Sequence, residues 1–385
     1  MAIQPAAKTI VLSGGGTGGH ITPILAVAHE LKKQDPTVRT IYIGERGGKF
    51  QELTATHEAI DEIYTIWAGK FRRYHGESWL RRLFAVRTNL LNVRDLFYFL
   101  FGTVQSWFLL RKIRPDVVFL KGGFVGVPVG IAARLLHKPF VTHDSDALPG
   151  LANRLVGRWA ALHAVAMAPE TYVYPQENTV QVGVLVEPHF QFVGPKEQAE
   201  MKKTLEIPGD SSVVLITGGS SGATNVNEAV VSIAQQLLAD FPKLTIIHQT
   251  GKGKSAIYGG YHHDRLKVVE FMRPMYVYTG AADVVVSRAS GNTVAELGVQ
   301  GKAVIVVPNP LLTGGHQLKN AQALADSQAA LVVSETPDAT DAPALDAAIR
   351  ELLHNSEKRA RLATRLHEIT LTNAAQKLAA IILKQ

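Results

Sequence analysis

The sequence predicts an α/β protein with two lobes, each built on a parallel, doubly wound sheet. Three observations support this fold class. The chain has 385 residues, which exceeds the size that a single hydrophobic core usually reaches. Short apolar runs alternate with amphipathic helical patterns, as they do in parallel sheets. A glycine-rich loop occurs twice, at residues 14–19 and 218–222, each time after an apolar run and before a helical pattern.

The predicted strands form two series that are separated by a linker. The first series comprises residues 9–13, 38–43, 116–120, 139–142, 162–166 and 179–183. The second series comprises residues 213–217, 244–248, 266–270, 283–286, 303–307 and 330–333. Amphipathic helical patterns separate these runs, for example at residues 22–34, 224–239, 292–299, 316–326 and 356–368.

These series define the predicted domains. Residues 1–186 form the N-terminal domain and residues 187–371 the C-terminal domain, which begins with a linker over residues 187–210. The sequence does not place a last helical segment, residues 372–385, although packing against the N-terminal domain is one option.

Composition limits the classes of protein to which the chain can belong. The absence of cysteine excludes disulfides and thiolate metal sites. The first eight residues lack the apolar core of a signal peptide, and no run of eighteen apolar residues predicts a transmembrane helix. A cytoplasmic location is the simplest interpretation. The formal charge of +7 and the pI of about 9.4 leave nucleic acid, anionic membranes and phosphorylated substrates as possible partners.

Basic and aromatic residues gather between residues 70 and 112. Residues 70–87 contain six basic residues and one acidic residue, and aromatic and leucine residues lie between the arginines. An apolar face flanked by Lys and Arg suits an anionic membrane surface. A core helix with a solvated basic edge is the alternative, and no nucleic-acid motif accompanies the stretch. We therefore expect residues 70–112 to bind peripherally to the inner face of the cell membrane, and we expect no nucleic-acid partner.

The first glycine loop predicts a site for a phosphate. Backbone N–H groups in residues 14–19 can approach a pyrophosphate closely, and the helix that follows adds its positive end. The loop is not a Walker loop, because no Gly-Lys-Ser/Thr follows it, and a plain tight turn is the alternative. His20 at its end could accept a proton from a sugar hydroxyl, or it could cap the helix or orient a ligand.

A second group of polar residues follows strands of the C-terminal domain. Ser220 in the second glycine loop could bind a phosphate oxygen or cap the next helix. Residues 290–293 form another strand–turn–helix corner. Glu296 lies one turn further on, where a carboxylate can accept both hydroxyls of a ribose, although an interaction with the helix dipole is the alternative. One face of the next helix carries His316, Gln317 and Asn320.

In this order, the motifs resemble those of the MurG family, the peptidoglycan N-acetylglucosaminyltransferases of glycosyltransferase family 28. The resemblance covers about residues 8–380, with two further similar segments at residues 121–128 and 143–154. The principal motifs are Gly-Gly-Thr-Gly-Gly-His at 15–20, Gly-Gly-Ser-x-Gly-Ala at 218–223, Ser-Gly-x-Thr-Val-x-Glu at 290–296 and His-Gln-x-x-Asn-Ala at 316–321.

This resemblance implies a glycosyltransferase B fold, with two Rossmann-like domains separated by a cleft and with neither a metal nor a cofactor. It implies that the N-terminal domain binds lipid I and the membrane, and that the C-terminal domain binds UDP-N-acetylglucosamine. The residues implied on the acceptor side are Thr17, Gly18, Gly19 and His20. Those implied for the donor are Ser220 at the diphosphate, Met272 at uracil, Glu296 at the ribose, Gly291, Asn292 and Thr293 at the phosphate and sugar, and Gln317 with His316 beside the sugar.

Two substrate-site positions depart from the pattern of the family. Asp146 stands where the family has an Asn that contacts the sugar, and Glu187 stands where it has an Arg that faces the diphosphate. A carboxylate near a diphosphate is unfavourable, so Glu187 turns away or another cation, such as Arg288 or Lys70, takes the place of the Arg. The pair Asp144 and Asp146 also matches the Asp-x-Asp of metal-dependent glycosyltransferases, but the implied fold meets the charge of the leaving group with N–H groups and a helix dipole.

The resemblance implies an inverting, metal-independent reaction in which N-acetylglucosamine passes from its UDP donor to lipid I, giving lipid II for peptidoglycan synthesis. His20 is the candidate catalytic base. Three alternatives remain at this point. They are a glycosyltransferase that acts on another lipid, an enzyme similar to UDP-N-acetylglucosamine 2-epimerase, and a membrane-bound nucleotide-binding subunit without activity, which Asp146 and Glu187 suggest.

Overall fold

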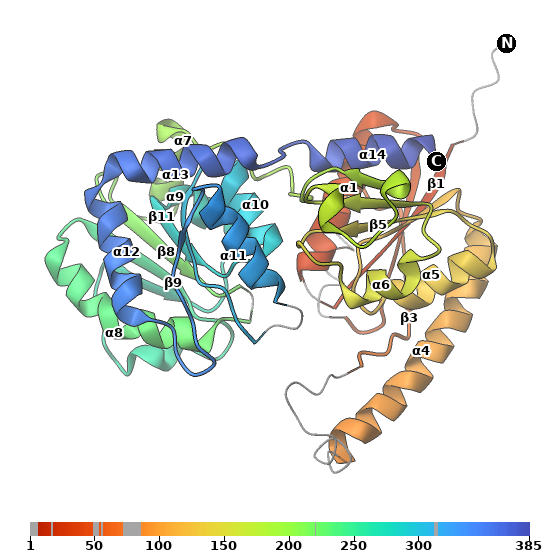
Figure 1. Ribbon diagram of the computed structural model, residues 1–385, viewed down its shortest axis with the longest axis horizontal. Helices are drawn as coiled ribbons and strands as arrows, with labels where there is room; N and C mark the ends of the chain where they lie inside the picture. The colour runs from red at the N-terminus through yellow and green to blue at the C-terminus, as the bar shows by residue number, and fades with distance from the viewer. Residues whose placement is uncertain are drawn as a thin grey trace. The chain divides into compact units, whose positions relative to one another are not determined.

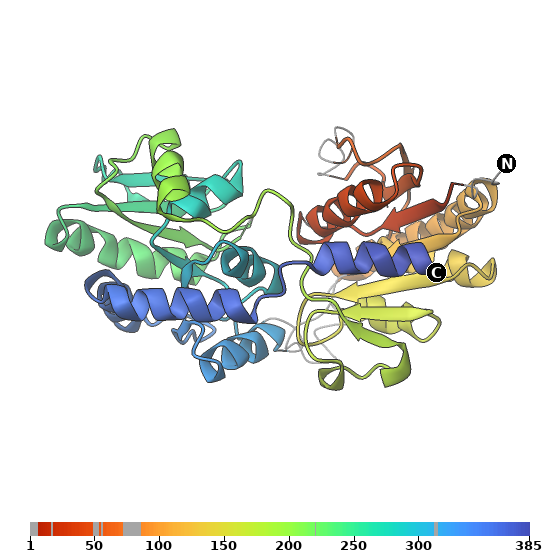
Figure 2. The same ribbon diagram turned by 90° about the horizontal axis from the view of Figure 1, so that it is seen from above.

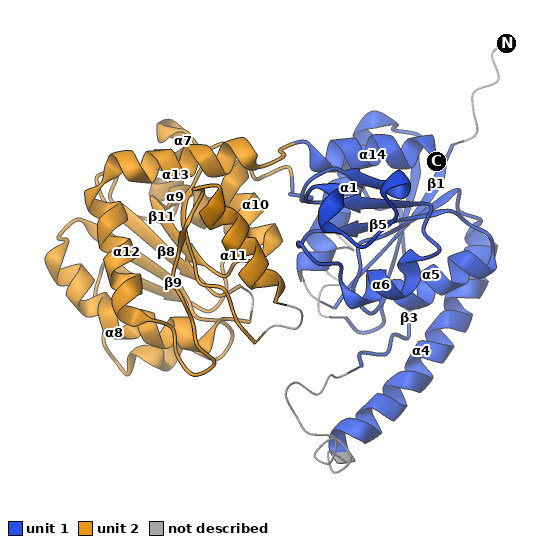
Figure 3. Ribbon diagram, in the orientation of Figure 1, with its two compact units in different colours: residues 1–187, 373–385 blue, residues 188–372 orange. Residues whose placement is uncertain are grey.

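The chain forms two compact α/β units (Figures 1 and 3). This computed structural model describes residues 7–16, 18–48, 54, 57–71, 86–219, 221–311 and 315–385. Unit 1 comprises Met1–Glu187 together with Asn373–Gln385, and unit 2 comprises Pro188–Thr372. Each unit has its own parallel sheet with helices on both faces, so the predicted fold class is confirmed.

The sheet of unit 1 has seven strands in the order β3-β2-β1-β4-β5-β6-β7, and every neighbouring pair is parallel. This order places β1 in the middle, with successive strands added first on one side and then on the other. The strands are β1 (Thr9–Ser13), β2 (Arg39–Glu45), β3 (Glu62–Ile66), β4 (Val117–Leu120), β5 (Phe140–Asp144), β6 (Leu162–Val165) and β7 (Thr179–Gln181).

Alternate residues of the strands in unit 1 face two separate helical layers. On β1, Ile10 and Leu12 share a core with α1 and α14, whereas Val11 shares a core with α4, α5 and α6. This division follows from the period of two along a strand. The helices are α1 (Gly18–Gln34), α4 (Val86–Ile113), α5 (Gly126–Leu135), α6 (Leu151–Gly157) and α14 (Ala374–Lys384).

The sheet of unit 2 repeats the order of the first six strands of unit 1, as β10-β9-β8-β11-β12-β13. Its strands are β8 (Ser212–Thr217), β9 (Leu244–Gln249), β10 (Leu266–Val269), β11 (Val284–Ser287), β12 (Ala303–Val306) and β13 (Leu331–Val332). Its helices are α7 (Pro195–Thr204), α8 (Thr224–Asp240), α9 (Met275–Ala281), α10 (Gly291–Val299), α11 (His316–Asp326), α12 (Ala342–His354) and α13 (Ser356–Ile369). On β8, Val214 and Ile216 pack with α8 and α12, whereas Val213 and Leu215 pack with α10 and α11.

Helix α14 belongs to unit 1 although it is the last element of the chain. It lies beside α1 (Figure 2) and buries Ala375, Leu378 and Ile382 on one face. At the end of the helix, Lys8 Nζ donates a hydrogen bond of 2.6 Å to the carbonyl oxygen of Leu383. The two ends of the chain therefore contribute to one core.

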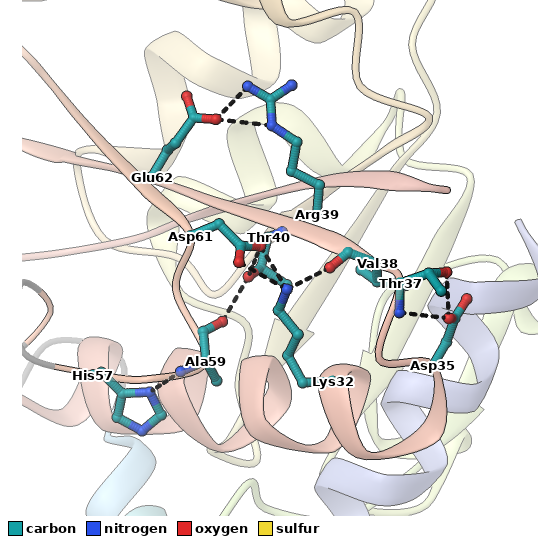
Figure 4. Close-up of polar contacts among 10 residues, drawn as sticks. All are labelled: Lys32, Asp35, Thr37, Val38, Arg39, Thr40, His57, Ala59, Asp61 and Glu62. Carbon is teal, nitrogen blue, oxygen red and sulfur yellow. Dashed lines mark hydrogen bonds and ion pairs between the residues drawn. The ribbon is translucent and has the colours of Figure 1, made fainter. Parts of the chain in front are cut away.

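Polar contacts tie α1 to an edge of the sheet (Figure 4). Lys32 Nζ, on α1, donates a 2.7 Å hydrogen bond to the carboxylate of Asp61. The same carboxylate accepts the backbone N–H of Thr40 on β2, at 2.7 Å. Arg39 pairs with Glu62 across β2 and β3. These contacts hold β3 beside β2. The sequence did not predict a strand for the residues that form β3.

The basic aromatic stretch contains one long helix. Helix α4 has 28 residues, and its first turns extend beyond the sheet of unit 1 (Figure 1). Part of the predicted membrane segment, residues 72–85, lies outside the described residues. In the part of the chain that the structure describes, no helix combines the length and the apolar character needed to cross a membrane.

The packing of α14 predicts a large effect for a small change. Leu378 is fully buried, so Leu378→Ala is expected to lower the free energy of unfolding by about 2–5 kcal/mol through lost burial and a cavity. Leu135→Ala is the matched control, because Leu135 is an exposed leucine of the same unit, and it is expected to change stability by less than about 0.5 kcal/mol. Urea-induced unfolding measures both. Equal effects would contradict the docking of α14.

Candidate active site

Each sheet reverses its strand order at one point, between β1 and β4 in unit 1 and between β8 and β11 in unit 2. Ligands of doubly wound sheets bind beyond the carboxyl ends of the strands at such a switch point. The glycine loops singled out in the sequence follow β1 and β8, so both lie at switch points. The candidate site of each unit is therefore built on the loops that leave these central strands.

In unit 1, the first glycine loop packs backbone against backbone on the loop that follows β4. A Cβ on Gly123 would lie 2.2 Å from the carbonyl oxygen of Gly15, and a Cβ on Gly16 would lie 2.6 Å from the ring of Phe124. Gly16 and Gly123 also have positive φ values of 94° and 75°. Glycine is required here because side chains would separate the two loops. The loop consequently presents main chain at the switch point.

His20 lies in the first turn of α1, directly after this loop, and its side chain is half-buried. Loss of hydration lowers the pKa of His20 to about 4, and the ammonium of Lys121 acts in the same direction. The carboxylate of Asp146 opposes them by favouring the imidazolium. The imidazole is therefore neutral near pH 7, in the form that can accept a proton.

Lys121 is the first residue after β4, and only 4% of its surface is exposed. Its Nζ donates a hydrogen bond of 2.9 Å to Ser145 Oγ. Burial lowers the pKa of Lys121 to about 8, and the carboxylates of Asp144 and Asp146 act in the opposite direction. Unit 1 therefore holds a buried cation at its switch point, with two carboxylates and an imidazole around it.

The two carboxylates of the predicted Asp-x-Asp pair have different surroundings. Asp144 is buried, and its oxygens accept the N–H of Gly150 at 2.9 Å and the hydroxyl of Tyr174 at 2.8 Å. Burial raises the pKa of Asp144. Asp146 is half-buried and acts electrostatically on both His20 and Lys121. Among the residues that the structure describes, no group of three or more His, Asp or Glu side chains is arranged to hold a metal ion.

A pocket of about 250 Å³ adjoins the same glycine loop. Gly15 and Gly16 line it together with Tyr42 and Glu45 from β2 and with Lys70. Burial raises the pKa of Glu45, and Lys70 acts in the opposite direction. The pocket thus offers a carboxylate, an ammonium and backbone groups beside the switch point.

In unit 2, the second glycine loop also depends on a close main-chain approach. Gly222 has a φ of 69°, and a Cβ on it would lie 2.0 Å from the carbonyl oxygen of Thr250. The N–H of Gly219 donates to Thr217 Oγ1 at 3.0 Å, and the same hydroxyl donates to Gln249 Oε1 at 2.7 Å. These bonds orient the loop that leaves β8.

The neighbouring corner of unit 2 is formed by α10 and α11. Asn320 on α11 donates a 3.0 Å hydrogen bond to the carbonyl oxygen of Ala289, just before α10. Gln317 is buried, and its Oε1 accepts the N–H of Asn309 at 2.9 Å. Glu296 is half-buried, one turn into α10. The corner therefore combines a helix N-terminus with a carboxylate and amide side chains.

Most of the predicted site residues follow strands that form these two switch points or lie next to them. In unit 1, Gly18 and Gly19 open α1 before His20, and Asp146 follows β5. In unit 2, the first turns of α10 and α11 contain Gly291, Asn292, Thr293, His316 and Gln317. Two predicted residues, Thr17 and Ser220, lie outside the described residues.

Three other residues have more specific surroundings. Met272 buries its side chain in the core of unit 2, which leaves only its main-chain atoms for the contact predicted from the sequence. Glu187 is the last residue of unit 1 and is half-buried. The guanidinium of Arg288 donates to Glu335 at 2.6 Å and to the carbonyl oxygen of Val307 at 3.0 Å. Arg288 is thus engaged within unit 2, which disfavours it as a substitute for the Arg that Glu187 replaces.

Comparison with known proteins decides the family. Residues 10–165 match the glycosyltransferase family 28 N-terminal domain, and residues 213–379 match the C-terminal domain of the same family. The chain belongs to glycosyltransferase family 28. The resemblance inferred from the motifs is therefore confirmed, and the protein is a glycosyltransferase.

Relatives match this family 28 glycosyltransferase over nearly its whole length. Two are named UDP-N-acetylglucosamine--N-acetylmuramyl-(pentapeptide) pyrophosphoryl-undecaprenol N-acetylglucosamine transferase. The one from Natranaerobius thermophilus is 31% identical over 97% of this chain and 98% of the relative. The one from Lachnospira eligens is 35% identical over 90% of this chain and 91% of the relative. The crystal structure of MurG from Acinetobacter baumannii is 26% identical, with a TM-score of 0.70 over 98% of this chain and all of that one.

Two features of this glycosyltransferase were not assigned a role from its sequence. Lys121 stood out only as the start of a glycine motif, because lysine is rarely buried and its local sequence does not mark it as an exception. The pocket beside Glu45 and Lys70 depends on residues far apart in the sequence, so no local pattern could reveal it.

Buried histidines make the stability of this glycosyltransferase sensitive to acid. His163 pairs through Nδ1 with Thr142 Oγ1 at 2.8 Å, and His248 with Tyr258 and Asn227 at 2.8 and 3.1 Å. Burial lowers the pKa of each from 6.5 to about 4. The unfolded chain therefore binds more protons than the folded one between these values, and the free energy of unfolding is expected to fall as the pH drops from 6.5 to 4.

Urea unfolding at a series of pH values measures this slope. His248→Gln removes one of the titrating groups and is expected to reduce the slope, whereas His262→Gln, at an exposed position, is expected to leave it unchanged. A slope that is unaffected by His248→Gln would contradict this account.

Proposed function

We propose that this family 28 glycosyltransferase transfers N-acetylglucosamine from UDP-N-acetylglucosamine to lipid I, the N-acetylmuramoyl-peptide carried on pyrophosphoryl-undecaprenol. The product is lipid II, the precursor of peptidoglycan. The observation that carries the proposal is the identity of 31% and 35%, over nearly the full chain, with transferases named for this reaction. The two switch-point sites supply the chemistry that the reaction needs.

Unit 2 binds the donor in this proposal. The N-terminus of α10 and the second glycine loop meet the diphosphate, where N–H groups and the helix dipole stabilise the negative charge that develops on UDP. Glu296 accepts the ribose hydroxyls, and Gln317 contacts the sugar through its amide nitrogen, since its oxygen already accepts the N–H of Asn309. The main chain at Met272 meets uracil.

Unit 1 binds the acceptor and holds the base. The C4 hydroxyl of the muramoyl group attacks C1 of N-acetylglucosamine, and the bond between C1 and the β-phosphate oxygen breaks with its electron pair going to UDP. The hydroxyl proton moves to His20, whose neutral imidazole is ready to receive it. Gly18 and Gly19 lie at the acceptor beside this histidine.

Replacing the base tests the proposed reaction. His20→Gln is expected to lower kcat by about 10²–10⁴-fold, because proton transfer in the transition state is lost. The measurement is the transfer of labelled N-acetylglucosamine from UDP to a lipid I analogue. His29→Gln, two turns along the same helix, is the control and is expected to keep full turnover. Near-full turnover by a folded His20→Gln protein would overturn the base assignment, and no transfer by the unmodified protein would overturn the reaction.

We also propose that α4 places the enzyme on an anionic membrane surface. Its large apolar side chains Leu90, Val93, Phe97, Phe101 and Phe108 are exposed and recur at helical spacing along one face. The opposite face is held tightly, because a Cβ on Gly102 would lie 1.8 Å from the carbonyl oxygen of Trp67. The exposed stripe is thus fixed in position.

Charges near the stripe favour a lipid surface as its occupant. Arg87, Arg94, Arg111 and Lys112 on the same helix are exposed, and the chain as a whole has a formal charge of +7. Basic side chains beside an apolar helical face attract anionic headgroups while the apolar groups enter the interface. A lipid-linked acceptor also requires the enzyme to work at a membrane.

Vesicle binding tests this surface. The protein is expected to bind vesicles that contain anionic phospholipid and to be released by salt. Phe101→Gln is expected to weaken binding about tenfold, because a phenyl group no longer enters the interface. Phe192→Gln in unit 2 is the matched control, since Phe192 and Phe101 are 60% and 61% exposed. The membrane proposal would be overturned if the protein failed to bind vesicles. If it also formed dimers, and if Phe101→Gln made these dimers dissociate, the stripe would be a contact surface for a second copy of the chain.

A further inference from the structure

A buried carboxamide in unit 2 lies beside the second glycine loop with only one of its two polar atoms engaged. Gln249 is the last residue of β9, and only 3% of its surface is exposed. Its Oε1 accepts a hydrogen bond of 2.7 Å from Thr217 Oγ1. Among the residues that the structure describes, none accepts a hydrogen bond from Gln249 Nε2. A buried amide nitrogen without a partner is unfavourable, so this donor calls for an explanation.

The preceding residue of the same strand provides a contrast. His248 is also buried, but its Nδ1 and Nε2 pair with Tyr258 and Asn227 at 2.8 and 3.1 Å. Successive side chains of a strand point to opposite faces of the sheet, so Gln249 faces away from this network. The unpaired nitrogen is therefore a property of one side chain and not of the whole end of β9.

Gln249 continues the row of side chains that faces α10 and α11. Ile247, two residues earlier on β9, lies in the core that also contains Leu215 and Met272. Thr217 follows Leu215 on β8 in the same way, and it is the direct partner of Gln249 across the two strands. The carboxamide therefore lies at the carboxyl ends of β8 and β9, on the face of the sheet that α10 covers.

The hydroxyl of Thr217 fixes the orientation of this carboxamide. Thr217 Oγ1 accepts the N–H of Gly219 at 3.0 Å and gives its one proton to Gln249 Oε1. The oxygen of the amide consequently faces Thr217, and the N–H groups on Nε2 point away from it. Since Gly219 belongs to the second glycine loop, one hydroxyl ties both the loop and the carboxamide to the end of β8.

We propose that Gln249 is a binding residue for the donor: its Nε2 donates a hydrogen bond to the diphosphate of UDP-N-acetylglucosamine. This inference rests on the proposed function and adds to it a contact from the end of β9. A glycine loop that leads into a helix binds phosphate, and charged phosphate oxygens are strong acceptors for N–H groups. The bond from Thr217 holds the amide in place before the donor arrives, so binding costs little side-chain freedom.

Charges at the same loop favour the diphosphate over the uridine as the acceptor of this bond. Lys254 Nζ donates to Thr224 Oγ1 at 3.2 Å, at the first residue of α8. The first turn of α8, which lies within the described residues, contains no acidic side chain. An ammonium and the positive end of a helix therefore meet where the glycine loop ends, and both attract an anion. Uridine carries no charge that these groups would attract.

Calorimetric titration of the full-length protein with UDP tests the contact, and NMR titration measures the weaker binding of uridine. Gln249→Met keeps the length of the side chain and removes its N–H groups. The affinity for UDP is expected to fall about 10–100-fold, because a hydrogen bond to a charged group is lost. The affinity for uridine is expected to stay the same. An unchanged affinity for UDP, or equal losses for both ligands, would overturn the proposal.

A double-mutant cycle with Thr217→Val separates a direct contact from an effect through the glycine loop. If Gln249 acted only by holding Thr217, Gln249→Met would weaken UDP binding no further in the Thr217→Val protein. A direct contact predicts a further loss of about tenfold or more in that background. The absence of this further loss would contradict the proposed contact.

Gln300→Met is the matched control. Gln300 is a fully buried glutamine of unit 2, but its Nε2 donates to the carbonyl oxygen of Tyr276 at 2.8 Å. Its replacement is expected to destabilise the protein and to leave the affinity for UDP unchanged. The same loss of affinity in both Met variants would mean that the effect of Gln249→Met is not specific, which overturns the proposal.

A second variant keeps the proposal testable if Gln249→Met does not fold. In Gln249→Glu, a carboxylate oxygen still accepts the hydroxyl of Thr217, whereas the N–H groups are replaced by an acceptor. The affinity for UDP is expected to fall at least about tenfold, because a carboxylate repels the diphosphate where an amide donated to it. An unchanged affinity would overturn the contact.

Binding of UDP requires neither the acceptor nor turnover, so the experiments separate this inference from the proposed function. If Gln249→Met binds UDP normally while the unmodified protein transfers N-acetylglucosamine to lipid I, only the contact of Gln249 is wrong. If UDP binding depends on Gln249 but no transfer to lipid I occurs, the contact stands and the proposed reaction is wrong.

Discussion

Both units depend on the close approach of two main-chain segments at the carboxyl ends of their central strands. In unit 1, Gly123 meets the carbonyl oxygen of Gly15, and in unit 2, Gly222 meets that of Thr250, at distances that leave no space for a Cβ. Parallel strands bring successive loops to the same edge of the sheet, and glycine allows those loops to touch. The helix N-termini and polar groups of both candidate sites are positioned by this packing.

Features that follow from local patterns could be predicted from the sequence. The apolar runs gave the strands to within about two residues, except β3, whose half-buried edge position mixes Glu62 and Tyr64 with apolar residues. The repeated glycine loop likewise predicted two similar lobes, each with a strand–turn–helix corner. The position of α14 could not be predicted, because an amphipathic helix carries no information about which of two similar units it will cover.

The electrostatics of the candidate site were the least predictable part. The sequence identified His20 and Asp146, but their relation to Lys121 depends on three strands and a helix that meet only in the folded unit. Burial then changes the chemistry of each group, since the same lysine on a surface would have little effect on an imidazole. Interactions between charges that are close in the fold but far apart in the sequence cannot be predicted from the spacing of residues along the chain.

The return of α14 to unit 1 has a consequence for biosynthesis. Unit 2 is encoded by one continuous segment, Pro188–Thr372, whereas unit 1 needs residues from both ends of the chain. A ribosome therefore releases everything needed for unit 2 before it releases Leu378 and Ile382, which complete the core of unit 1. The core of unit 1 therefore cannot be completed until these residues have been synthesised, after the whole of unit 2.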